Sequence, residues 1–426
     1  MKDKIRVGYI GLGHRGCSML FESFAQMTDV EIAYICDLYD DKIEKAVNFF
    51  KEDGLPVPTV TKDYREIIAD DTVDAVINMT GWPEHVTITK ASLLAGKYTA
   101  VEVGCAYTIK ECWDLVDAHE KTGAPLMMLE NCCYGRREMT ALKMAKDGAF
   151  GEIVHAVGSY SHYLPDCDLF VSRGEQGYPY RVAEYINRNC EQYPTHELGP
   201  IAKILGINRG NRMMTLNSVA SKSRGLSDYC ERRFGDENPF KNTIFKQGDI
   251  VNTLITCANG ETISLTLDTT IPRAFYSRSF SIRGTHGMCD ENRRVFFLEG
   301  MEEPVENNED EMMPKYEHPL HEEYVKEKAV GGHGGIDWLV CRAFIESVKA
   351  GTNTPIDAYD TAALMAIAPL SEESILKGGA PIEFPDFTRG KWFHREPAVK
   401  QKYSLDDVCE DNATAISEYY RKKGNK

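Results

Sequence analysis

Three glycines near the N-terminus have the spacing of a turn that binds a dinucleotide. Gly11, Gly13 and Gly16 come directly after the apolar run 5–10 and open a stretch with helical character. In such a turn the first glycine permits the tight bend, the second lets the backbone approach a pyrophosphate, and the third lets helix and strand pack closely. The amino end of the helix then attracts negative charge. The spacing therefore predicts a binding site for a dinucleotide cofactor.

Asp37 indicates which dinucleotide this turn would take. It ends the second apolar run, about 20 residues after Gly16, where an acidic side chain can accept hydrogen bonds from the adenosine ribose. Because a carboxylate there would repel a 2′-phosphate, the residue favours NAD over NADP. His14 and Arg15 lie inside the turn and are predicted to contact the cofactor. Arg15 could pair with a phosphate, but we expect it to lie against the pyrophosphate or the adenine.

The chain around this turn has the pattern of an α/β fold. Up to about residue 130, short β-rich runs alternate with helical stretches, which is typical of a doubly wound parallel sheet. We therefore expect an N-terminal Rossmann domain over residues 1–131. Its predicted strands are 5–10, 31–36, 75–78, 98–102 and 126–130, and its predicted helices are 17–26, 40–51, 63–68, 85–95 and 109–122.

A different pattern follows residue 137. A helix through Lys146 is succeeded by runs with period-two alternation and few helices between them, which predicts an α+β domain with an open, mostly antiparallel sheet. We expect this domain to span residues 132–426, to bind the substrate and to mediate oligomerisation. Its acidic segment, about 300–328, is predicted to be a solvated loop. The predicted strands are 154–160, 214–220, 250–256, 262–268 and 279–283.

The composition disfavours several classes of protein. The 426 residues exceed one compact core, and 42% hydrophobic with 27% charged residues is ordinary for a globular enzyme. A formal net charge of -16 disfavours nucleic acid as a partner. The sequence has no apolar run long enough for a membrane span and no room for a signal peptide before the first strand. We therefore expect a cytoplasmic protein.

Thirteen cysteines are scattered along the chain rather than spaced as a disulfide framework. The adjacent pair Cys132 and Cys133 has neither a CxxC partner nor a histidine cluster at ligand spacing. We expect reduced, mostly buried thiols with a structural role, and no metal site.

The sequence resembles the Gfo/Idh/MocA family of sugar and polyol oxidoreductases over nearly the whole chain. The glycine turn, Asp37, the segment 78–85, Glu102 and the antiparallel second domain carry this resemblance. Further motifs resemble the NAD-dependent glycosidase branch of that family, glycoside hydrolase family 109, whose known activity is α-N-acetylgalactosaminidase with tightly bound NAD. These motifs are MLENCCYG at 128–135, YPTHELGP at 193–200, GGHGGID at 331–337 and PDFTRG at 385–390.

The chain also departs from the patterns of its relatives. The family's dehydrogenases have Glu-Lys-Pro where this chain has Glu102, Val103 and Gly104, and they have an aspartate where it has Gln192, four residues before the histidine of the YPTH motif. The glycosidase branch also lacks that lysine, so the departure favours the glycosidase interpretation. The branch usually has glycine at the position of Glu197, which leaves the substrate open.

The resemblance implies which residues form the site. His196 would be the general base for a sugar hydroxyl, and Tyr193 would donate or accept a second proton. Tyr160 would contact the sugar and abstract or position the proton beside the oxidised carbon; the alternative is a half-buried strand tyrosine without a role in chemistry. The implied substrate contacts are Tyr160, Arg181, Tyr193, Pro194, Thr195, His196 and Tyr276. The implied contacts near the nicotinamide half are Trp82, His85, Glu102, Val103 and Asn131.

These expectations combine into one hypothesis and two alternatives. The hypothesis is an NAD-dependent glycosidase that oxidises a terminal sugar at C3, eliminates the glycosidic oxygen, adds water and reduces the sugar again. Such a route differs from hydrolysis by two carboxylates. The first alternative is an NAD-dependent sugar or polyol dehydrogenase, which would release stoichiometric NADH. The second is a non-catalytic NAD or sugar sensor, which would tolerate loss of His196. In each case the partner is a small molecule or glycan, and we expect a homo-oligomer.

Overall fold

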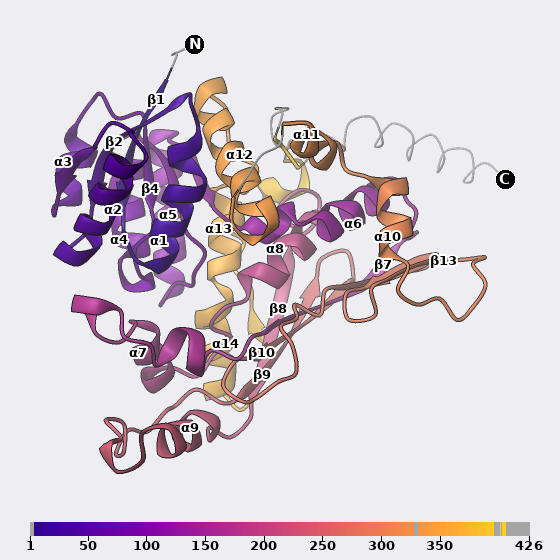
Figure 1. The fold of residues 1–426 in the computed structure, drawn as a ribbon. Coiled ribbons are helices and arrows are strands. Elements are labelled where there is room, and N and C mark those ends of the chain that lie inside the picture. The colour runs from indigo at the N-terminus through magenta and orange to yellow at the C-terminus, as the bar shows by residue number, and fades with distance from the viewer. Residues whose placement is uncertain (1–3, 328–330, 396–400, 402, 406–426) are drawn as a thin grey trace. The chain divides into compact units, whose positions relative to one another are not determined.

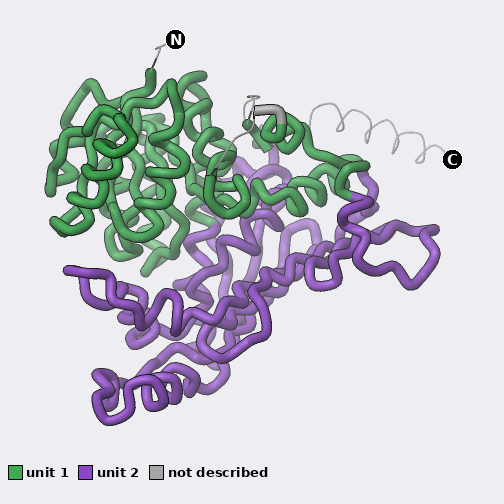
Figure 2. The backbone as a smooth tube through the Cα atoms, in the orientation of Figure 1, with its two compact units in different colours: residues 1–147, 313–363, 395–426 green, residues 148–312, 364–394 purple. Residues whose placement is uncertain are grey.

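The computed structural model describes residues 4–327, 331–395, 401 and 403–405. The chain packs as two compact units, shown in different colours in Figure 2: unit 1 comprises residues 1–147, 313–363 and 395–426, and unit 2 comprises residues 148–312 and 364–394. This division differs from the sequence boundary at 131/132, because residues 132–147 and the described residues of 313–363 pack with the N-terminal part of the chain. The two units are described separately below.

Unit 1 is built on a six-stranded sheet in which every neighbouring pair is parallel (Figure 1). The strand order is β3-β2-β1-β4-β5-β6, the order of the doubly wound dinucleotide-binding fold. The predicted parallel sheet is thus confirmed. The strands are β1 (Ile5–Ile10), β2 (Val30–Cys36), β3 (Thr59–Thr61), β4 (Ala75–Asn78), β5 (Tyr98–Val101) and β6 (Leu126–Met128).

The helices of this sheet begin and end where local signals place them. Thr108 and Glu111 form a reciprocal capping box at the start of α5, and Gly123 ends that helix in the left-handed conformation. The helix after the glycine turn begins three residues earlier than predicted, at His14, so His14 and Arg15 are helical. The helices following the strands are α1 (His14–Glu22), α2 (Asp40–Glu52), α3 (Tyr64–Ala69), α4 (Trp82–Leu94) and α5 (Ile109–Thr122).

Later segments of the chain also belong to unit 1. The 15-residue helix α12 (Ile336–Ala350) contacts both β1 and the short 3₁₀ helix η2 (Asn131–Tyr134). Arg342 and Lys349 on α12 form ion pairs with Asp29, which precedes β2. The other elements here are α6 (Arg136–Lys146), η6 (Met313–Tyr316), α11 (Pro319–Glu327), η7 (His333–Gly335) and most of α13 (Ala358–Met365).

Unit 2 is built on an open eight-stranded sheet in the order β13-β12-β11-β7-β10-β9-β8-β14. Among the described strand pairs of this sheet, only β7–β10 is parallel, so the prediction of an open, mostly antiparallel sheet is confirmed. The strands are β7 (Ile153–Ser161), β8 (Met213–Ala220), β9 (Ile250–Cys257), β10 (Thr262–Asp268), β11 (Ser281–Gly284), β12 (Gly287–Asp290), β13 (Val295–Leu298) and β14 (Ile382–Glu383). The helices are α7 (Arg181–Asn187), α8 (Thr195–Ile204), α9 (Gly225–Phe234), α10 (Glu309–Met312) and α14 (Ile367–Leu376).

The acidic segment corrects one prediction. Residues 300–328 were expected to be a solvated loop, but α10, η6 and α11 lie within them. Glu309 is buried and paired with Arg294, while Met312, Met313 and Leu320 are buried apolar side chains. Apolar residues distributed among the acidic ones therefore anchor this segment. The sequence analysis missed them because it considered only the run of acidic residues.

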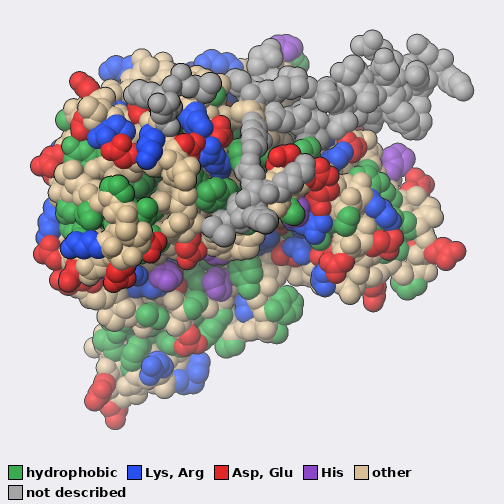
Figure 3. Space-filling view, turned by 45° about the horizontal axis from the view of Figure 1, so that its top comes forward, with side chains coloured by type: hydrophobic (Ala, Val, Ile, Leu, Met, Phe, Trp, Pro, Cys, Tyr) green, Lys and Arg blue, Asp and Glu red, His purple; other side chains and the backbone are tan. Residues whose placement is uncertain are grey.

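The described surface is mixed in charge. On the face shown in Figure 3, Lys and Arg side chains are scattered among Asp and Glu. None of the helices in the described residues combines the length and apolar character that a membrane span requires.

Candidate functional site

The glycine turn between β1 and α1 requires two of its glycines for steric reasons. Gly11 has φ +97, and a Cβ on it would lie 2.5 Å from the carbonyl carbon of Met79. A Cβ on Gly16 would lie 2.2 Å from the Gly11 oxygen. The Tyr9 hydroxyl donates a 2.7 Å hydrogen bond to the Gly16 carbonyl and fixes the start of the helix. Gly11 and Gly16 thus serve the fold itself, as their sequence positions predict.

Gly13 is different, because the described protein does not crowd it. Its φ of -61 and ψ of -174 suit any residue, and a Cβ there would meet no protein atom within 4 Å. The same residue precedes α1, whose amino end has no side-chain cap. A bare backbone beside an open helix amino end is the arrangement that binds a pyrophosphate. The turn therefore fits the predicted dinucleotide.

Asp37 joins the end of β2 to this turn. Its Oδ2 accepts a 2.6 Å hydrogen bond from the Leu12 N–H, and its Oδ1 accepts one of 3.0 Å from the Tyr39 N–H. These bonds hold the carboxylate at the carboxyl end of the sheet, where parallel α/β folds bind ligands. The carboxylate is thus oriented beside the turn before any cofactor arrives.

We expect calorimetry to show that the protein binds NAD more tightly than NADP, because the Asp37 carboxylate would repel a 2′-phosphate. In Asp37→Ser this preference should narrow by at least about 10-fold, since a charge-assisted hydrogen bond contributes about 1.5–3 kcal/mol. Asp53→Ser, in the cap after α2, is the matched control. Tighter binding of NADP by the unaltered protein would contradict the ribose assignment.

Arg15 is held by acidic side chains of unit 1. Its guanidinium makes two hydrogen bonds to Asp337, of 2.6 and 2.8 Å, and its Nε lies 3.4 Å from Glu102. Burial by itself raises the pKa of Asp337, but the bonds from Arg15 and His333 hold that pKa well below its usual range. Contact of Arg15 with the pyrophosphate or adenine stays a prediction. His14, beside it, is exposed.

The residues predicted near the nicotinamide meet at the carboxyl ends of β4 and β5. A Cβ on Gly104 would lie 2.5 Å from the Trp82 ring and 2.9 Å from His85 Nδ1, so glycine lets α4 approach this loop closely. His85 Nε2 lies 2.8 Å from the Thr80 carbonyl, and burial lowers the pKa of His85 to about 4. A neutral imidazole donating to Thr80 leaves Nδ1 as an acceptor. Val103 is buried beside them.

Asn131 follows β6 at the same edge of the sheet. It begins η2 and donates a 2.7 Å hydrogen bond from Nδ2 to Asp337 Oδ1. Cys132 and Cys133, next in the chain, are buried thiols rather than halves of a disulfide, and the Cys132 N–H donates to Glu130.

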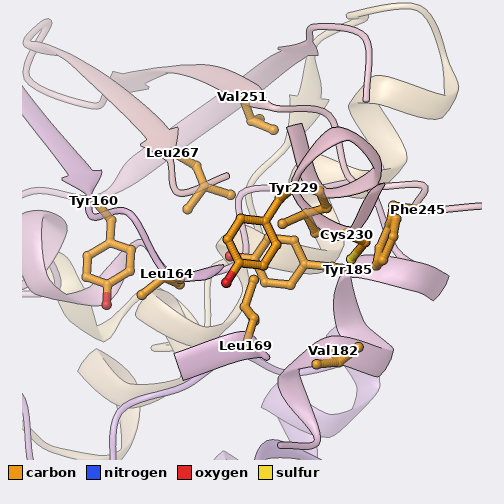
Figure 4. Packing of buried hydrophobic residues seen from close by; sticks show 11 residues of the cluster. Tyr160, Leu164, Leu169, Val182, Tyr185, Tyr229, Cys230, Phe245, Val251 and Leu267 are labelled. Atoms are coloured by element: carbon orange, nitrogen blue, oxygen red, sulfur yellow. The ribbon is translucent and has the colours of Figure 1, made fainter. Parts of the chain in front are cut away.

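The residues predicted to handle the substrate gather at the end of β7 in unit 2. The ring centroid of Tyr160 lies 4.4 Å from that of Tyr193, 5.9 Å from that of His196 and 6.4 Å from that of Tyr276. Tyr160 lies at one side of a buried apolar cluster, with its hydroxyl directed away from Leu267 (Figure 4). Burial raises the pKa of Tyr160. The structure therefore brings together three proton-carrying side chains and a fourth aromatic ring.

His196 stands in the first turn of α8, with Tyr193 just before the helix. The Tyr193 hydroxyl lies 3.3 Å from His196 Nε2, within hydrogen-bonding distance. Pro194 is the N-cap residue of this helix and Thr195 is its first residue; both are buried. Pro200 has no N–H to donate to the His196 carbonyl four residues earlier, so this intrahelical hydrogen bond is missing.

Arg181 supplies positive charge to this group. Its guanidinium carbon lies 4.7 Å from the centre of the Tyr193 ring, and its Nη1 donates a 2.7 Å hydrogen bond to Asp168. Burial disfavours its charge, but Asp168 and the neighbouring tyrosines raise the pKa of Arg181 well above its ordinary value. The arginine therefore stays charged and counteracts the rise in the pKa of Tyr160 that burial causes.

Glu197, which stands where the glycosidase branch usually has glycine, is fully buried between α8 and β7. A Cβ on Gly158 in β7 would lie 2.6 Å from the Glu197 Cβ. The absent side chain on the strand thus makes room for the larger one on the helix. Tyr160 is two residues beyond Gly158 on the same face of β7, so this contact also sets how closely α8 approaches the tyrosine.

The position four residues before His196 carries an amide, Gln192, rather than the aspartate of the dehydrogenases. Gln192 is buried, and its Nε2 donates a 2.5 Å hydrogen bond to Gln247. Burial raises the pKa of the neighbouring Glu191, which favours the neutral form of that carboxyl. The position that is charged in dehydrogenases of the family is therefore occupied by a neutral amide.

Three residues that the sequence analysis did not assign contribute to these sites. His162 Nδ1 lies 3.2 Å from the Tyr160 hydroxyl, and burial followed by the charge of Arg181 lowers the pKa of His162. Asp168 pairs with Arg181 and Arg173. Asp337 binds Arg15. His162 could have been found from its place two residues after Tyr160. Asp168 lies in a short π-helix, Pro165–Leu169, which the sequence analysis did not predict. Asp337 ends a motif that carried no assigned role.

Comparison with known proteins identifies relatives of both parts of the chain. A sequence profile of the glycosyl hydrolase 109 C-terminal domain matches residues 134–394, and one of the oxidoreductase family with an NAD-binding Rossmann fold matches residues 5–130. An α-N-acetylgalactosaminidase from Tannerella forsythia is 37% identical, over 92% of this chain and 88% of the relative. A glycosyl hydrolase family 109 protein from Stenotrophomonas maltophilia is also 37% identical, over 92% and 91% of the two chains.

Solved structures share the fold at lower identity. A levoglucosan dehydrogenase in complex with NADH and levoglucosan has a TM-score of 0.63 at 18% identity, covering 90% of this chain and all of the other. An NAD-binding oxidoreductase from Klebsiella pneumoniae has a TM-score of 0.69 at 13% identity, with the same coverage. These likenesses concern architecture. The N-terminal part of the chain is an NAD-binding Rossmann fold, and the chain as a whole belongs to the glycosyl hydrolase 109 family of NAD-dependent glycosidases.

Proposed function

We propose that the protein hydrolyses terminal glycosides of an N-acetylated sugar, with α-N-acetylgalactosaminides as the first candidate, by transient oxidation of the sugar at C3. The observation that carries this proposal is the group of Tyr160, Tyr193 and His196 around a charged Arg181. Such a group can move two different protons of one sugar. The Tannerella forsythia relative, named an α-N-acetylgalactosaminidase, supports the choice of sugar.

His196 accepts the proton of the C3 hydroxyl in this scheme. Its Nε2 lies beside the Tyr193 hydroxyl, so the proton can be shared between them. Bound NAD would supply a hydride acceptor for C3, and because the oxidation is reversed within each turnover no external oxidant would be consumed. A carbonyl at C3 acidifies the C2 proton, which allows the glycosidic oxygen at C1 to leave.

Tyr160 is the proposed group at C2. Its hydroxyl contacts His162, and the charge of Arg181 favours its ionised form against the effect of burial, which raises its pKa. After the C1 oxygen has left as the alcohol, water adds at C1 and a proton returns to C2. The net reaction is hydrolysis, with NAD unchanged. General acid–base groups of this kind contribute about 10²–10⁴-fold each to a rate.

The dehydrogenase alternative has weaker support. Val103 and Gly104 replace the lysine and proline of the dehydrogenases, and Gln192 replaces their aspartate. Gly104 also makes room for Trp82 and His85, so the loop differs in shape as well as in charge. A non-catalytic sensor would not need a histidine and tyrosine within hydrogen-bonding distance of each other.

Hydrolysis of an aryl α-N-acetylgalactosaminide in deuterated water tests the proposal. Deuterium should enter C2 of the released sugar, because the C2 proton leaves and a solvent proton returns. The absorbance of reduced nicotinamide should not accumulate during steady turnover. A direct displacement at C1 never breaks the C2–H bond. Product without deuterium, formed together with stoichiometric NADH, would leave the dehydrogenase standing and overturn the glycosidase scheme. The matching β-glycoside and the galactoside without the acetamido group serve as substrate controls.

We further propose that residues 1–131 hold the cofactor and residues 132–426 bind the sugar and form a homo-oligomer in the cytoplasm. The two profile matches meet between residues 130 and 134, which supports this functional division. Val219 and Leu254 are 53% and 51% exposed on the neighbouring strands β8 and β9, which supports a covering partner for the open sheet. The cysteines in the described residues form no disulfide, as expected in a reducing compartment. Light scattering that shows a monomer would contradict the assembly.

A further inference from the structure

The carboxylate of Asp337 connects loops that follow different strands of the cofactor sheet. Its Oδ1 accepts hydrogen bonds from Arg15 Nη2 at 2.8 Å and from Asn131 Nδ2 at 2.7 Å. Its Oδ2 accepts hydrogen bonds from Arg15 Nη1 at 2.6 Å and from His333 Nδ1 at 2.8 Å. The carboxylate is 1% exposed, while the Arg15 side chain is 27% exposed. Four donors therefore converge on one buried anion.

Two of these donor residues follow strands that are not adjacent in the sheet. Arg15 follows β1, and Asn131 follows β6, with β4 and β5 lying between them in the sheet. At a spacing of about 4.8 Å per strand, β1 and β6 are about 14 Å apart. Arg15 also lies near Glu102, which follows β5. Asp337 thus spans the carboxyl edge of the sheet, the edge at which open α/β folds bind their ligands.

The local chain is shaped to cover this carboxylate. A Cβ on Gly332 would lie 2.6 Å from Asp337 Oδ2, so the segment before α12 can pass the acid only with glycine there. Asp337 itself stands in the first turn of α12, where the helix dipole favours a negative charge. The close approach at Gly332, the position in the first turn of α12 and the hydrogen bonds all keep the Asp337 carboxylate in one place.

We propose that Asp337 is a positioning residue that ties the glycine turn to the Asn131 loop and thereby retains NAD between turnovers. This inference rests on the proposed function, in which the hydride returns to the sugar and the cofactor need not leave. The turn at Gly11–Gly16 is predicted to contact the pyrophosphate of NAD, and the loop at Asn131 its nicotinamide half. An anion that fixes both keeps these two contacts with the cofactor in place, which slows its release.

The test compares Asp337→Asn with Asp29→Asn in the full-length protein. The amide in Asp337→Asn keeps the volume of the side chain but accepts at one oxygen only. NAD should therefore dissociate at least about 10-fold faster, and less NAD should remain after purification, as loss of one charge-assisted bond predicts. Asp29 also binds α12, through Arg342 and Lys349, but at the opposite end of the strands. Asp29→Asn should therefore leave NAD dissociation unchanged while removing comparable ion pairs.

Amide hydrogen exchange of the NAD-free proteins provides a second measurement. Asp337→Asn should speed exchange both in the glycine turn and in η2. If that variant does not fold, Arg15→Gln replaces it, because Arg15 reaches Asn131 through Asp337, and its loss should still speed exchange in η2. Equal NAD dissociation in the two aspartate variants, or exchange in η2 that does not respond, overturns this inference alone. An unaltered protein that fails to bind NAD overturns the proposed function instead.

Discussion

Replacing His196 with alanine is expected to lower kcat by at least about 100-fold, since removing a general acid–base group costs about 10²–10⁴-fold in rate. The imidazole is within hydrogen-bonding distance of Tyr193 and lies beside Tyr160, so its loss removes the shared acceptor for the C3 hydroxyl proton. It belongs to unit 2, whereas the residues assigned to NAD belong to unit 1. The affinity for NAD, measured by calorimetry, should therefore change little.

A matched control for this variant is His286→Ala in the same unit. His286 lies in the turn between β11 and β12 and pairs with Glu299 at the surface. Its removal should leave kcat and KM unchanged. If His196→Ala keeps activity within a few-fold of the unaltered enzyme while remaining folded by circular dichroism, His196 is not the general base.

Gly13→Val is expected to weaken NAD binding by about 100-fold or more while the protein stays folded. The backbone angles at Gly13 suit valine, and a Cβ there meets no protein atom within 4 Å, so the folded chain accommodates valine without a clash. The valine side chain would instead clash with the bound pyrophosphate, because it would occupy the space between the pyrophosphate and the amino end of the helix. Losing one or two hydrogen bonds to a charged group, each about 1.5–3 kcal/mol, gives an effect of this size.

The thermal midpoint of the NAD-free protein separates this effect from unfolding. Gly13→Val should match the unaltered protein without NAD and should lose the rise in midpoint that NAD produces. Gly16→Val is the contrasting variant, because its Cβ would lie 2.2 Å from the Gly11 oxygen and must disturb the fold even without NAD. A Gly13→Val protein that still binds NAD at the original affinity would show that the cofactor does not approach this backbone.

Sequence reasoning predicted unit 1 more fully than unit 2. The five predicted strands of the parallel sheet are short, mostly buried runs between helices with strong signals, such as the Thr108 capping box and Gly123 of α5. The sixth strand, β3, was missed because it has three residues and is mostly exposed. The order of these strands in the sheet follows from the glycine turn after the first strand, because this turn is typical of the doubly wound dinucleotide-binding fold. The β9 and β10 strands of unit 2 were also found, because one buried face gives strict alternation.

The remaining elements lack such local signals. Strands β12 and β13 have four residues each and β14 has two, too few for a period to be recognised. The acidic residues around Glu309 conceal α10, whose burial depends on Arg294 from a neighbouring turn. Asp168 and Asp337 act through partners that are 13 and 322 residues away, and no sequence pattern connects residues at those separations. Only tertiary structure shows these pairs.

The fit between Glu197 and Gly158 constrains how this motif can change. A glutamate introduced opposite a strand residue with a side chain would overlap it, since even one Cβ at 158 approaches to 2.6 Å. A glycine introduced first at 158 leaves only a small gap, which a protein tolerates at modest cost. The two positions are therefore coupled, because the Glu197 side chain leaves no room for a Cβ at 158. If the Thr-His-Glu version of the motif is transferred to a relative, glycine at position 158 and glutamate at position 197 should be introduced together.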